Sequence, residues 1–226
     1  MDQRIMQVNV FKFLTAPFRS FETDKKDSSM LDDTLSPSLF RKDNAFDDLY
    51  PEHIRALSPM HWTSVDIAKK AGEFLAMPDA KVLDIGSGVG KFCLVAGFFH
   101  PGTTFYGIEQ RSELFTFAEM AREEIDLLNV SFIHGNLTEL AFDDYDHFYF
   151  YNPFYENIEP DSRIDYAVKT SFELYDRYSR FVYEMLDKKP PETRLVTFHG
   201  ADGQVPPGYR LVSNSYSRFL KMWIKE

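Results

Sequence analysis

From residue 80 onward the chain alternates short apolar runs with longer amphipathic segments, and this alternation constrains the fold more than any other feature. The apolar runs predict strands at 81–85, 104–108, 131–134, 147–151 and 194–199. The amphipathic segments predict helices at 90–99, 112–127 and about 161–187. Strand, helix and strand in series give a parallel sheet with helices on both faces, because consecutive parallel strands need a crossover connection.

The C-terminal end departs from this pattern. The segment GYRLVSNSYSRFLKMWI holds two extended stretches with no room for a crossover helix between them. We expect them to be joined at Asn214-Ser215 and to form an antiparallel hairpin that closes one edge of the sheet. The prediction is therefore an α/β doubly wound sheet of seven strands.

The N-terminal part differs in composition from the rest. One face of a short helix is predicted from an apolar set, which comprises Ile5, Val8, Phe11, Leu14 and Phe18. The polar stretch ETDKKDSSMLDD follows and is typical of a loop. A further helical pattern in SVDIAKKAGEFLAM leads into the first strand. We predict a helical or irregular extension over residues 1–60 and one α/β domain over 61–226.

Composition narrows the classes of function. The chain has 226 residues, 25 basic and 35 acidic, so its formal net charge is 25 − 35 = −10. The basic residues are scattered, which argues against long duplex nucleic acid as a partner. Cys93 is the single cysteine and the six histidines show no metal-binding spacing, so we expect no disulfide and no metal. The sequence lacks a secretory signal and a long apolar run, which favours a cytoplasmic protein without a membrane partner.

The turn DIGSGVG at residues 84–90 predicts a nucleotide site. A P-loop is excluded, because only three residues separate Gly86 from Gly90 and Phe92 stands where a hydroxyl is needed. The dinucleotide fingerprint is excluded as well, since it requires Gly or Ala at the position of Lys91. Asp84 would repel a pyrophosphate and suits a ligand with an ammonium group.

VLDIGSGVG resembles the first motif of the class I S-adenosylmethionine (SAM) dependent methyltransferases, a family with a Rossmann-like fold. The resemblance implies SAM as the cofactor and places Asp84 near its amino group. It also implies that the turn contacts the methionine part, through Gly86, Ser87, Gly88 and Gly90. The family has an acid after the second strand that accepts from the ribose hydroxyls, and FYGIEQ supplies Glu109 there, followed by Gln110.

Two further cofactor contacts follow from the same resemblance. After the third strand the family often has an acid that accepts from the adenine amino group, and HGNLTEL places Asn136 there, with the backbone N–H of Leu137 beside it. A turn-forming Asn136 is the alternative. Upstream, MHWTSVDIA matches a loop that contacts the methionine part, which makes Trp62 and Thr63 candidates, although Thr63 or Ser64 also fits a helix N-cap.

The stretch HFYFYNPFYE carries the expected chemistry. Residues 152–155 resemble the N/D-P-P-Y/F motif of methyltransferases that act on planar nitrogens, with Phe154 in place of the second proline. The carbonyl groups of Asn152 and Pro153 would orient the target nitrogen, and the ring of Tyr155 would stack on it. A weaker resemblance is to the non-SET histone lysine methyltransferases. Core packing of these aromatic residues is the structural alternative.

The sequence therefore predicts a SAM-dependent methyltransferase, directed at nitrogen in an unidentified protein or small-molecule acceptor. One alternative is a SAM-binding or interaction protein that has the fold without the activity. Another is a methyltransferase directed at oxygen or at nucleic acid. The sequence does not determine the oligomeric state.

Overall fold

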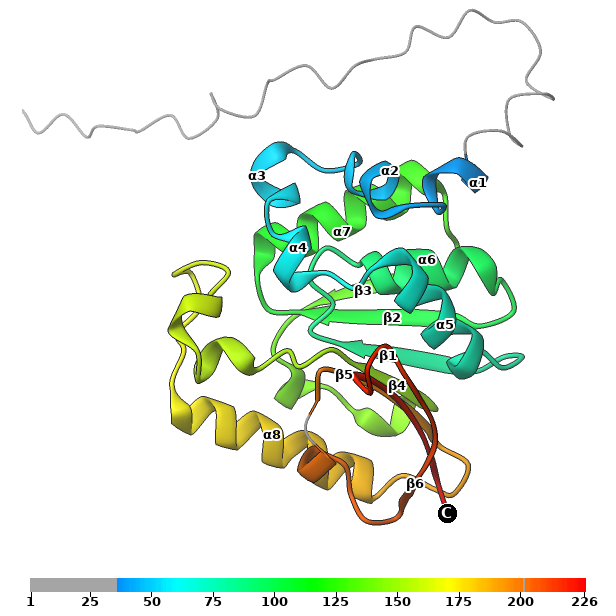
Figure 1. Cartoon of the computed structure of the whole chain (residues 1–226), viewed down its shortest axis with the longest axis vertical. Helices are drawn as coiled ribbons and strands as arrows, with labels where there is room; N and C mark the ends of the chain where they lie inside the picture. Colours follow the sequence, from blue (N-terminus) through cyan, green and yellow to red (C-terminus); the bar gives the residue numbers. More distant parts are fainter. Residues whose placement is uncertain (1–35, 201) are drawn as a thin grey trace, which may run out of the picture. The chain divides into compact units, whose positions relative to one another are not determined.

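The computed structural model describes residues 36–200 and 202–226, which belong to one compact unit. A mixed sheet of seven strands lies at its centre (Figure 1), in the order β3-β2-β1-β4-β5-β7-β6. The strands are β1 (Lys81–Ile85), β2 (Thr104–Glu109), β3 (Val130–His134), β4 (His147–Phe150), β5 (Arg194–Phe198), β6 (Tyr209–Ser215) and β7 (Leu220–Lys225). The predicted seven-stranded α/β fold is confirmed.

The sheet order creates a crevice beside β1. The first five strands pair in parallel, and β1 has β2 on one side and β4 on the other. The chain runs outward from β1 through β2 to β3 and then returns to the opposite side of β1. Ligands bind at such a switch point, outside the carboxyl ends of the strands. The glycine turn after β1 and the turn after β4 therefore reach the same edge.

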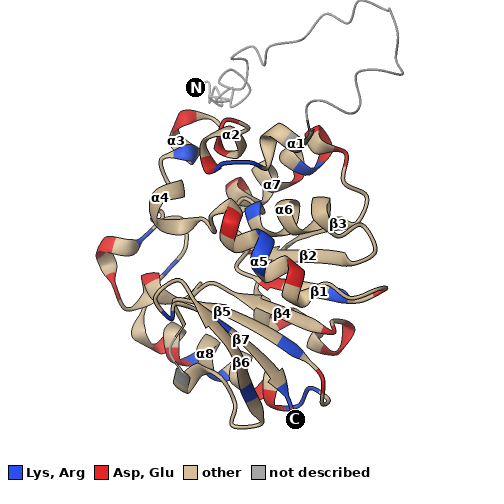
Figure 2. Cartoon of the chain, turned by 45° about the vertical axis from the view of Figure 1, so that its right-hand side comes forward, with Lys and Arg blue, Asp and Glu red and all other residues tan. Residues whose placement is uncertain are grey.

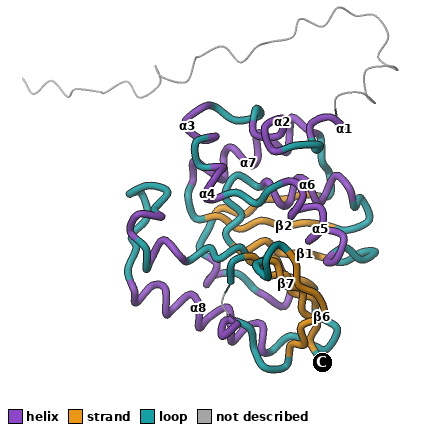
Figure 3. The backbone as a smooth tube through the Cα atoms, in the orientation of Figure 1, coloured by secondary structure: helices purple, strands orange, loops and turns teal. Residues whose placement is uncertain are grey.

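Alternate strand residues face two different cores. Val82 of β1 packs in the core that also takes residues of α5 (Val65–Leu75), α6 (Lys91–Phe99) and α7 (Ser112–Ile125). Leu83 packs in the other core, against α8 (Phe172–Asp187). Helices thus cover both faces of the sheet, as Figures 1 and 3 show. This arrangement is the one that a series of parallel strands requires.

The segment before α5 is helical, as predicted, and it packs on the α/β core. It contains α1 (Ser36–Leu39), α2 (Asp43–Asp47), α3 (Glu52–Arg55) and α4 (Ser58–His61). Phe40, Phe46 and Tyr50 are buried in the core that contains α5 and α6. The helix expected over residues 5–18 lies outside the described residues. The domain boundary at residue 60 stays a prediction.

Two details differ from the sequence prediction. Helix α8 begins at Phe172 and not near residue 161, because the Ser171 side chain caps it by accepting from the Leu174 amide at 3.2 Å. The terminal hairpin is confirmed, but Asn214 and Ser215 lie in β6, paired with β7. The turn comprises residues 216–219, three of which have a positive φ.

In Figure 2, which colours the backbone by residue type, acidic and basic residues are interspersed along the elements of the fold. Within the part of the chain that the structure describes, no helix combines the length and the apolar character needed to cross a membrane.

Candidate functional site

The glycine turn between β1 and α6 has a conformation that only glycine adopts easily. Gly86, Gly88 and Gly90 have φ values of 77°, 55° and 83°. A Cβ atom at Gly86 would lie 2.5 Å from Cβ of Pro153, and one at Gly90 would lie 2.2 Å from the ring of Phe132. At Gly88 no atom lies within 4 Å of that position, so the turn is open to a ligand there. The glycine residues therefore allow this turn to pack closely against the turn that follows β4.

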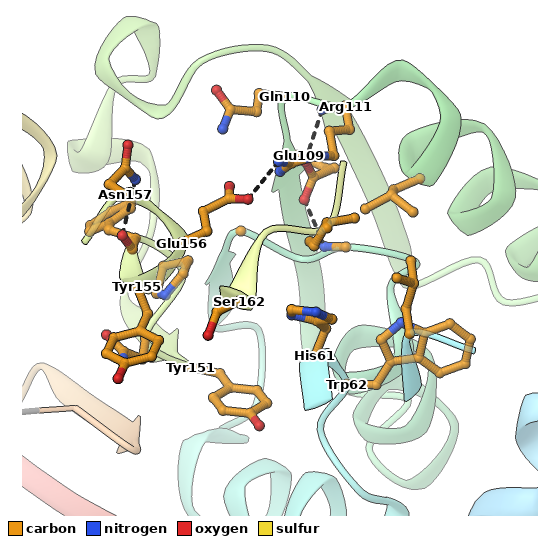
Figure 4. A pocket seen from close by; sticks show the side chains of 18 of the residues that line it. His61, Trp62, Glu109, Gln110, Arg111, Tyr151, Tyr155, Glu156, Asn157 and Ser162 are labelled. Carbon is orange, nitrogen blue, oxygen red and sulfur yellow. Dashed lines mark hydrogen bonds and ion pairs between the residues drawn. The ribbon is translucent and has the colours of Figure 1, made fainter. Parts of the chain in front are cut away.

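Glu109 ends β2 and holds its carboxylate against this turn (Figure 4). One oxygen, Oε2, accepts from the Gly88 amide at 3.0 Å, and the other, Oε1, accepts from the Arg111 amide at 2.8 Å. Burial raises the pKa of Glu109, and the bonds from Arg111 and Gly88 act in the opposite direction. A carboxylate has about four acceptor sites, so the Glu109 carboxylate can still accept from a ligand hydroxyl.

Asp84 lies near the end of β1, two residues before Gly86, and is almost completely buried. The Cys93 thiol of α6 donates to its Oδ2 atom at 3.8 Å. Burial raises the pKa of the Asp84 carboxyl well above its usual range, and the pKa of the Cys93 thiol also rises well above its usual value for the same reason. The Asp84 carboxyl therefore lies in the protein interior, outside the pocket lining, with the Cys93 thiol as its hydrogen-bond partner.

A pocket of about 600 Å³ opens at the carboxyl edge of the sheet. The residues predicted from the sequence that line it are Trp62, Gly86, Gly88, Glu109, Gln110, Leu137, Asn152, Pro153 and Tyr155. The predicted residues that lie outside its lining are Thr63, Asp84, Ser87, Gly90 and Asn136. Both turns inferred from the sequence thus meet in one cavity.

Thr63 and Asn136, two of the residues outside the lining, have hydrogen-bond partners of their own. Thr63 Oγ1 lies 2.9 Å from the Tyr149 hydroxyl in the interior, and Ser64 is the cap of α5. Asn136 Oδ1 accepts from the amide of Thr138 at 3.0 Å and from its hydroxyl at 2.8 Å, and Asn136 Nδ2 donates to the Tyr178 hydroxyl. The oxygen considered for adenine therefore already accepts two hydrogen bonds.

The turn after β4 presents Asn152 to the pocket. Its φ of 35° is unusual for a residue other than glycine, and its carbonyl oxygen accepts from the Tyr155 amide at 3.2 Å. Phe154 is buried between the rings of Phe150 and Tyr178, with centroids 5.6 and 5.5 Å away. Phe154 therefore anchors the turn by packing, at the position where the related motif has its second proline.

Tyr151 and two histidine side chains, which the sequence did not assign to the site, form the wall beside Asn152. The Tyr151 hydroxyl donates to the Met60 carbonyl at 3.2 Å, and the Tyr151 ring lies 5.7 Å from that of His199. His61 enters the pocket from α4 (Figure 4). Burial lowers the pKa of both His61 and His199, which favours their neutral forms. The position of His61 next to Trp62 was the one available sequence signal.

Arg111 and Glu156 were also missed and lie on the opposite side of the pocket. The guanidinium Nη2 atom of Arg111 donates to Glu156 Oε2 at 2.7 Å, and both side chains are buried. Among the described residues that line the pocket, Arg111 is the single lysine or arginine. The pocket therefore offers no unpaired cationic side chain.

No protein-family model matches this chain, and no curated protein matches it. TrmN from Thermus thermophilus is similar in structure, with a TM-score of 0.52 and 18% identity over 76% of this chain and 52% of TrmN. The match thus spans about half the length of TrmN. An RNA methyltransferase from Salinibacter ruber, in complex with S-adenosyl-L-homocysteine, gives a TM-score of 0.49 and 20% identity over 71% of this chain and 88% of its own.

A SAM dependent methyltransferase from Aquifex aeolicus gives a TM-score of 0.47 and 16% identity over 70% of this chain and 88% of its own. At these identities, the likeness to TrmN shows the fold alone. The chain thus has the fold of the class I SAM-dependent methyltransferases.

Proposed function

We propose that this chain is a SAM-dependent methyltransferase that acts on nitrogen. One observation carries the proposal: the glycine turn, the Glu109 carboxylate and the turn that presents Asn152 line one pocket. Contact between Gly86 and Pro153 brings the two turns together, because a Cβ atom at Gly86 would lie only 2.5 Å from Cβ of Pro153. A cofactor bound along the glycine turn would therefore lie next to Asn152.

The residues present fit SAM. Gly88 and Gly135 are open on the side where a Cβ atom would stand, so a ligand can approach the backbone at both positions. Glu109 is fixed by two amide donors and can accept from a ribose diol. Leu137 provides an apolar contact for a purine. When bound, SAM supplies an activated methyl group on a sulfonium sulfur, which is a good leaving group.

The chain itself would orient the acceptor. The side-chain carbonyl of Asn152 and the backbone carbonyl of Pro153 would accept the N–H bonds of the target nitrogen, so that its lone pair faces the methyl carbon. The Tyr155 ring would stack on a planar acceptor group. In such a transfer the nitrogen–carbon bond would form as the carbon–sulfur bond breaks, the bonding electrons would remain on sulfur, and the nitrogen would release one proton to water.

The acceptor that we favour is a protein side chain or a small molecule. Arg111 is the single lysine or arginine of the described pocket lining, and it is already paired with Glu156. A nucleic-acid acceptor would bring phosphates that need cationic partners. The cytoplasmic location expected from the sequence stays a prediction.

Calorimetry with SAM and with S-adenosylhomocysteine tests the cofactor assignment. We expect both to bind the wild-type chain, and Glu109→Gln to weaken binding about tenfold, as loss of a charge-assisted bond to a ligand hydroxyl does. The matched control is Glu113→Gln, an exposed glutamate of the neighbouring helix α7. Absence of binding to the wild-type chain at millimolar concentration would refute the assignment.

The acceptor assignment is tested with labelled SAM and a panel of peptides and small amines. We expect methyl incorporation that Asn152→Ala abolishes and that Asn214→Ala, on the exposed strand β6, leaves intact. Equal activity of Asn152→Ala and the wild-type chain would exclude the orienting role.

A non-catalytic SAM-binding protein is the second candidate, and Phe154 at the second-proline position favours it. Its signature would be SAM binding without methyl transfer to any member of the panel. Methylation of hydroxyl compounds or of RNA in the same assay would instead support the remaining alternative, an oxygen- or nucleic-acid-directed enzyme.

A further inference from the structure

Arg111 is bonded both to the acid expected to bind the cofactor and to the segment that follows the acceptor turn. Its backbone amide donates to Glu109 Oε1 at 2.8 Å, and so fixes the acid expected to bind the ribose. Its guanidinium group donates to Glu156 Oε2 at 2.7 Å and to Asp165 Oδ1 at 3.1 Å. Figure 4 shows the bonds to Glu109 and Glu156 side by side. A single residue thus connects the cofactor acid with the segment that follows the acceptor turn.

The ion pairs of Arg111 with Glu156 and Asp165 are mostly buried. The side chain of Arg111 is 4% exposed and that of Glu156 is 8% exposed, whereas Asp165 at 35% forms the outer end. Ion pairs with this degree of burial are screened little by solvent, and removing one partner leaves the other as an unpaired buried charge. The cluster therefore restrains the segment more strongly than a surface pair would.

The restrained segment, residues 155–165, forms a wall of the pocket. Glu156 directly follows Tyr155 of the acceptor turn, and Ser162 and Ile164 line the cavity further along. At the far end, Asp165 Oδ1 also accepts from the Ala167 amide at 3.0 Å, which holds the loop in a defined turn. Arg111 thus holds this wall near both of its ends.

We propose that Arg111 is a positioning residue that couples cofactor binding to the order of residues 155–165, and through them to the acceptor turn. This inference rests on the proposed SAM site. Arg111 acts through Glu109 on one side and through Glu156 and Asp165 on the other. Because such coupling is reciprocal, cofactor binding stabilises the segment, and loosening the segment weakens cofactor binding.

The test combines amide hydrogen exchange with calorimetry, on the full chain with S-adenosylhomocysteine as the probe. In the wild-type chain the probe is expected to slow exchange over residues 155–165. Glu156→Gln should weaken probe binding about tenfold and remove that protection. Asp165→Asn breaks only the half-exposed end, keeps the fold and should give the same changes to a smaller degree. Asp176→Asn, which breaks an exposed pair with Arg180, is the matched control.

The outcomes separate this inference from the proposed function. If the wild-type chain does not bind the probe, the proposed function fails and the inference fails with it. If the wild-type chain binds but Glu156→Gln and Asp165→Asn match it in affinity and in protection, the inference alone is overturned. Faster exchange in both variants with unchanged probe affinity would show a purely structural role and would also overturn it.

Discussion

The two sides of the pocket are built differently. On the cofactor side, both Glu109 oxygens are bonded to backbone amides, and the Gly86 and Ser87 amides donate to the Ile108 carbonyl. On the acceptor side, the Asn152 side chain has no hydrogen bond to another described residue, and Tyr155 is 43% exposed. The protein thus fixes the cofactor side itself and leaves the acceptor side available to a ligand.

Buried charge supports the cofactor side from behind. Lys91 is the first residue of α6, and its ammonium group lies 2.7 Å from Asp43 and 2.6 Å from Asp47 of α2. The Tyr50 hydroxyl donates to the carbonyl of Val89, within the glycine turn, at 3.0 Å. The segment before α5 is thus bonded to both residues that flank Gly90. We therefore expect changes on the cofactor side to lower the stability of the chain more than changes on the acceptor side.

The largest expected effect is on the charged support of the cofactor side. Lys91→Met leaves Asp47 buried without its cation, so we expect a loss of about 3 kcal/mol in the free energy of unfolding. Arg180→Met removes an exposed ion pair on α8 and should cost less than about 0.5 kcal/mol. Urea denaturation measures both. Similar losses for the two variants would show that the buried pair does not hold the turn.

The second largest expected effect on stability is at the contact between the glycine turn and Pro153. Gly86→Ala combines a positive φ with overlap on Pro153, whereas Gly88→Ala has the positive φ and open space. We expect Gly86→Ala to be less stable than Gly88→Ala by about 2 kcal/mol, the usual cost of overpacking. Thermal or urea unfolding gives the difference, and equal stabilities would argue against tight contact between the turns.

The pH dependence of stability tests the buried Asp84. Because burial raises its folded-state pKa, the folded chain keeps this proton to a higher pH than the unfolded chain does. Stability should therefore fall as the pH rises from the usual carboxyl range through the raised pKa. Asp84→Asn should lose this part of the dependence and be the more stable protein at the upper end. Parallel stability profiles for the wild-type chain and Asp84→Asn would mean that the pKa of Asp84 is not raised in the folded state.

The smallest expected effect on stability is at Asn152. Because its side chain has no hydrogen bond to any residue that the structure describes, Asn152→Gly should leave stability within about 0.5 kcal/mol of wild type. Asn152→Ala should cost about 1 kcal/mol, since alanine adopts a positive φ less readily. Calorimetric unfolding of the two variants checks this. A large loss in Asn152→Gly would show that the side chain is part of the structure and not free for a ligand.

Local patterns account for what the sequence predicted well. The apolar run at 81–85 and the three glycines after it predicted β1 and its turn, because strand burial and positive φ depend on nearby residues. Glu109 was a candidate because the family resemblance places an acid at the end of the next strand, and it lines the pocket. The ion pairs of Arg111 with Glu156 and of Lys91 with Asp47 join residues 45 and 44 positions apart and have no local signature.

The misplaced elements show where local signals mislead. Asn214-Ser215 is typical of a turn, but the register of β6 against β7, with an irregularity between Leu211 and Ser213, places both residues in the strand. The turn falls where Tyr216 and its two successors take positive φ values, which none of these residue types favours. Pairing across the sheet decided this position, and tertiary pairing overrides local propensity.

A crystal structure of the chain with S-adenosylhomocysteine would show whether the cofactor lies along the glycine turn, next to Asn152. The proposal predicts that the ribose hydroxyls lie within hydrogen-bond distance of the Glu109 carboxylate. It also predicts that the sulfur faces the space in front of Asn152. A product cofactor bound away from the glycine turn, or one whose sulfur points away from Asn152, would contradict it.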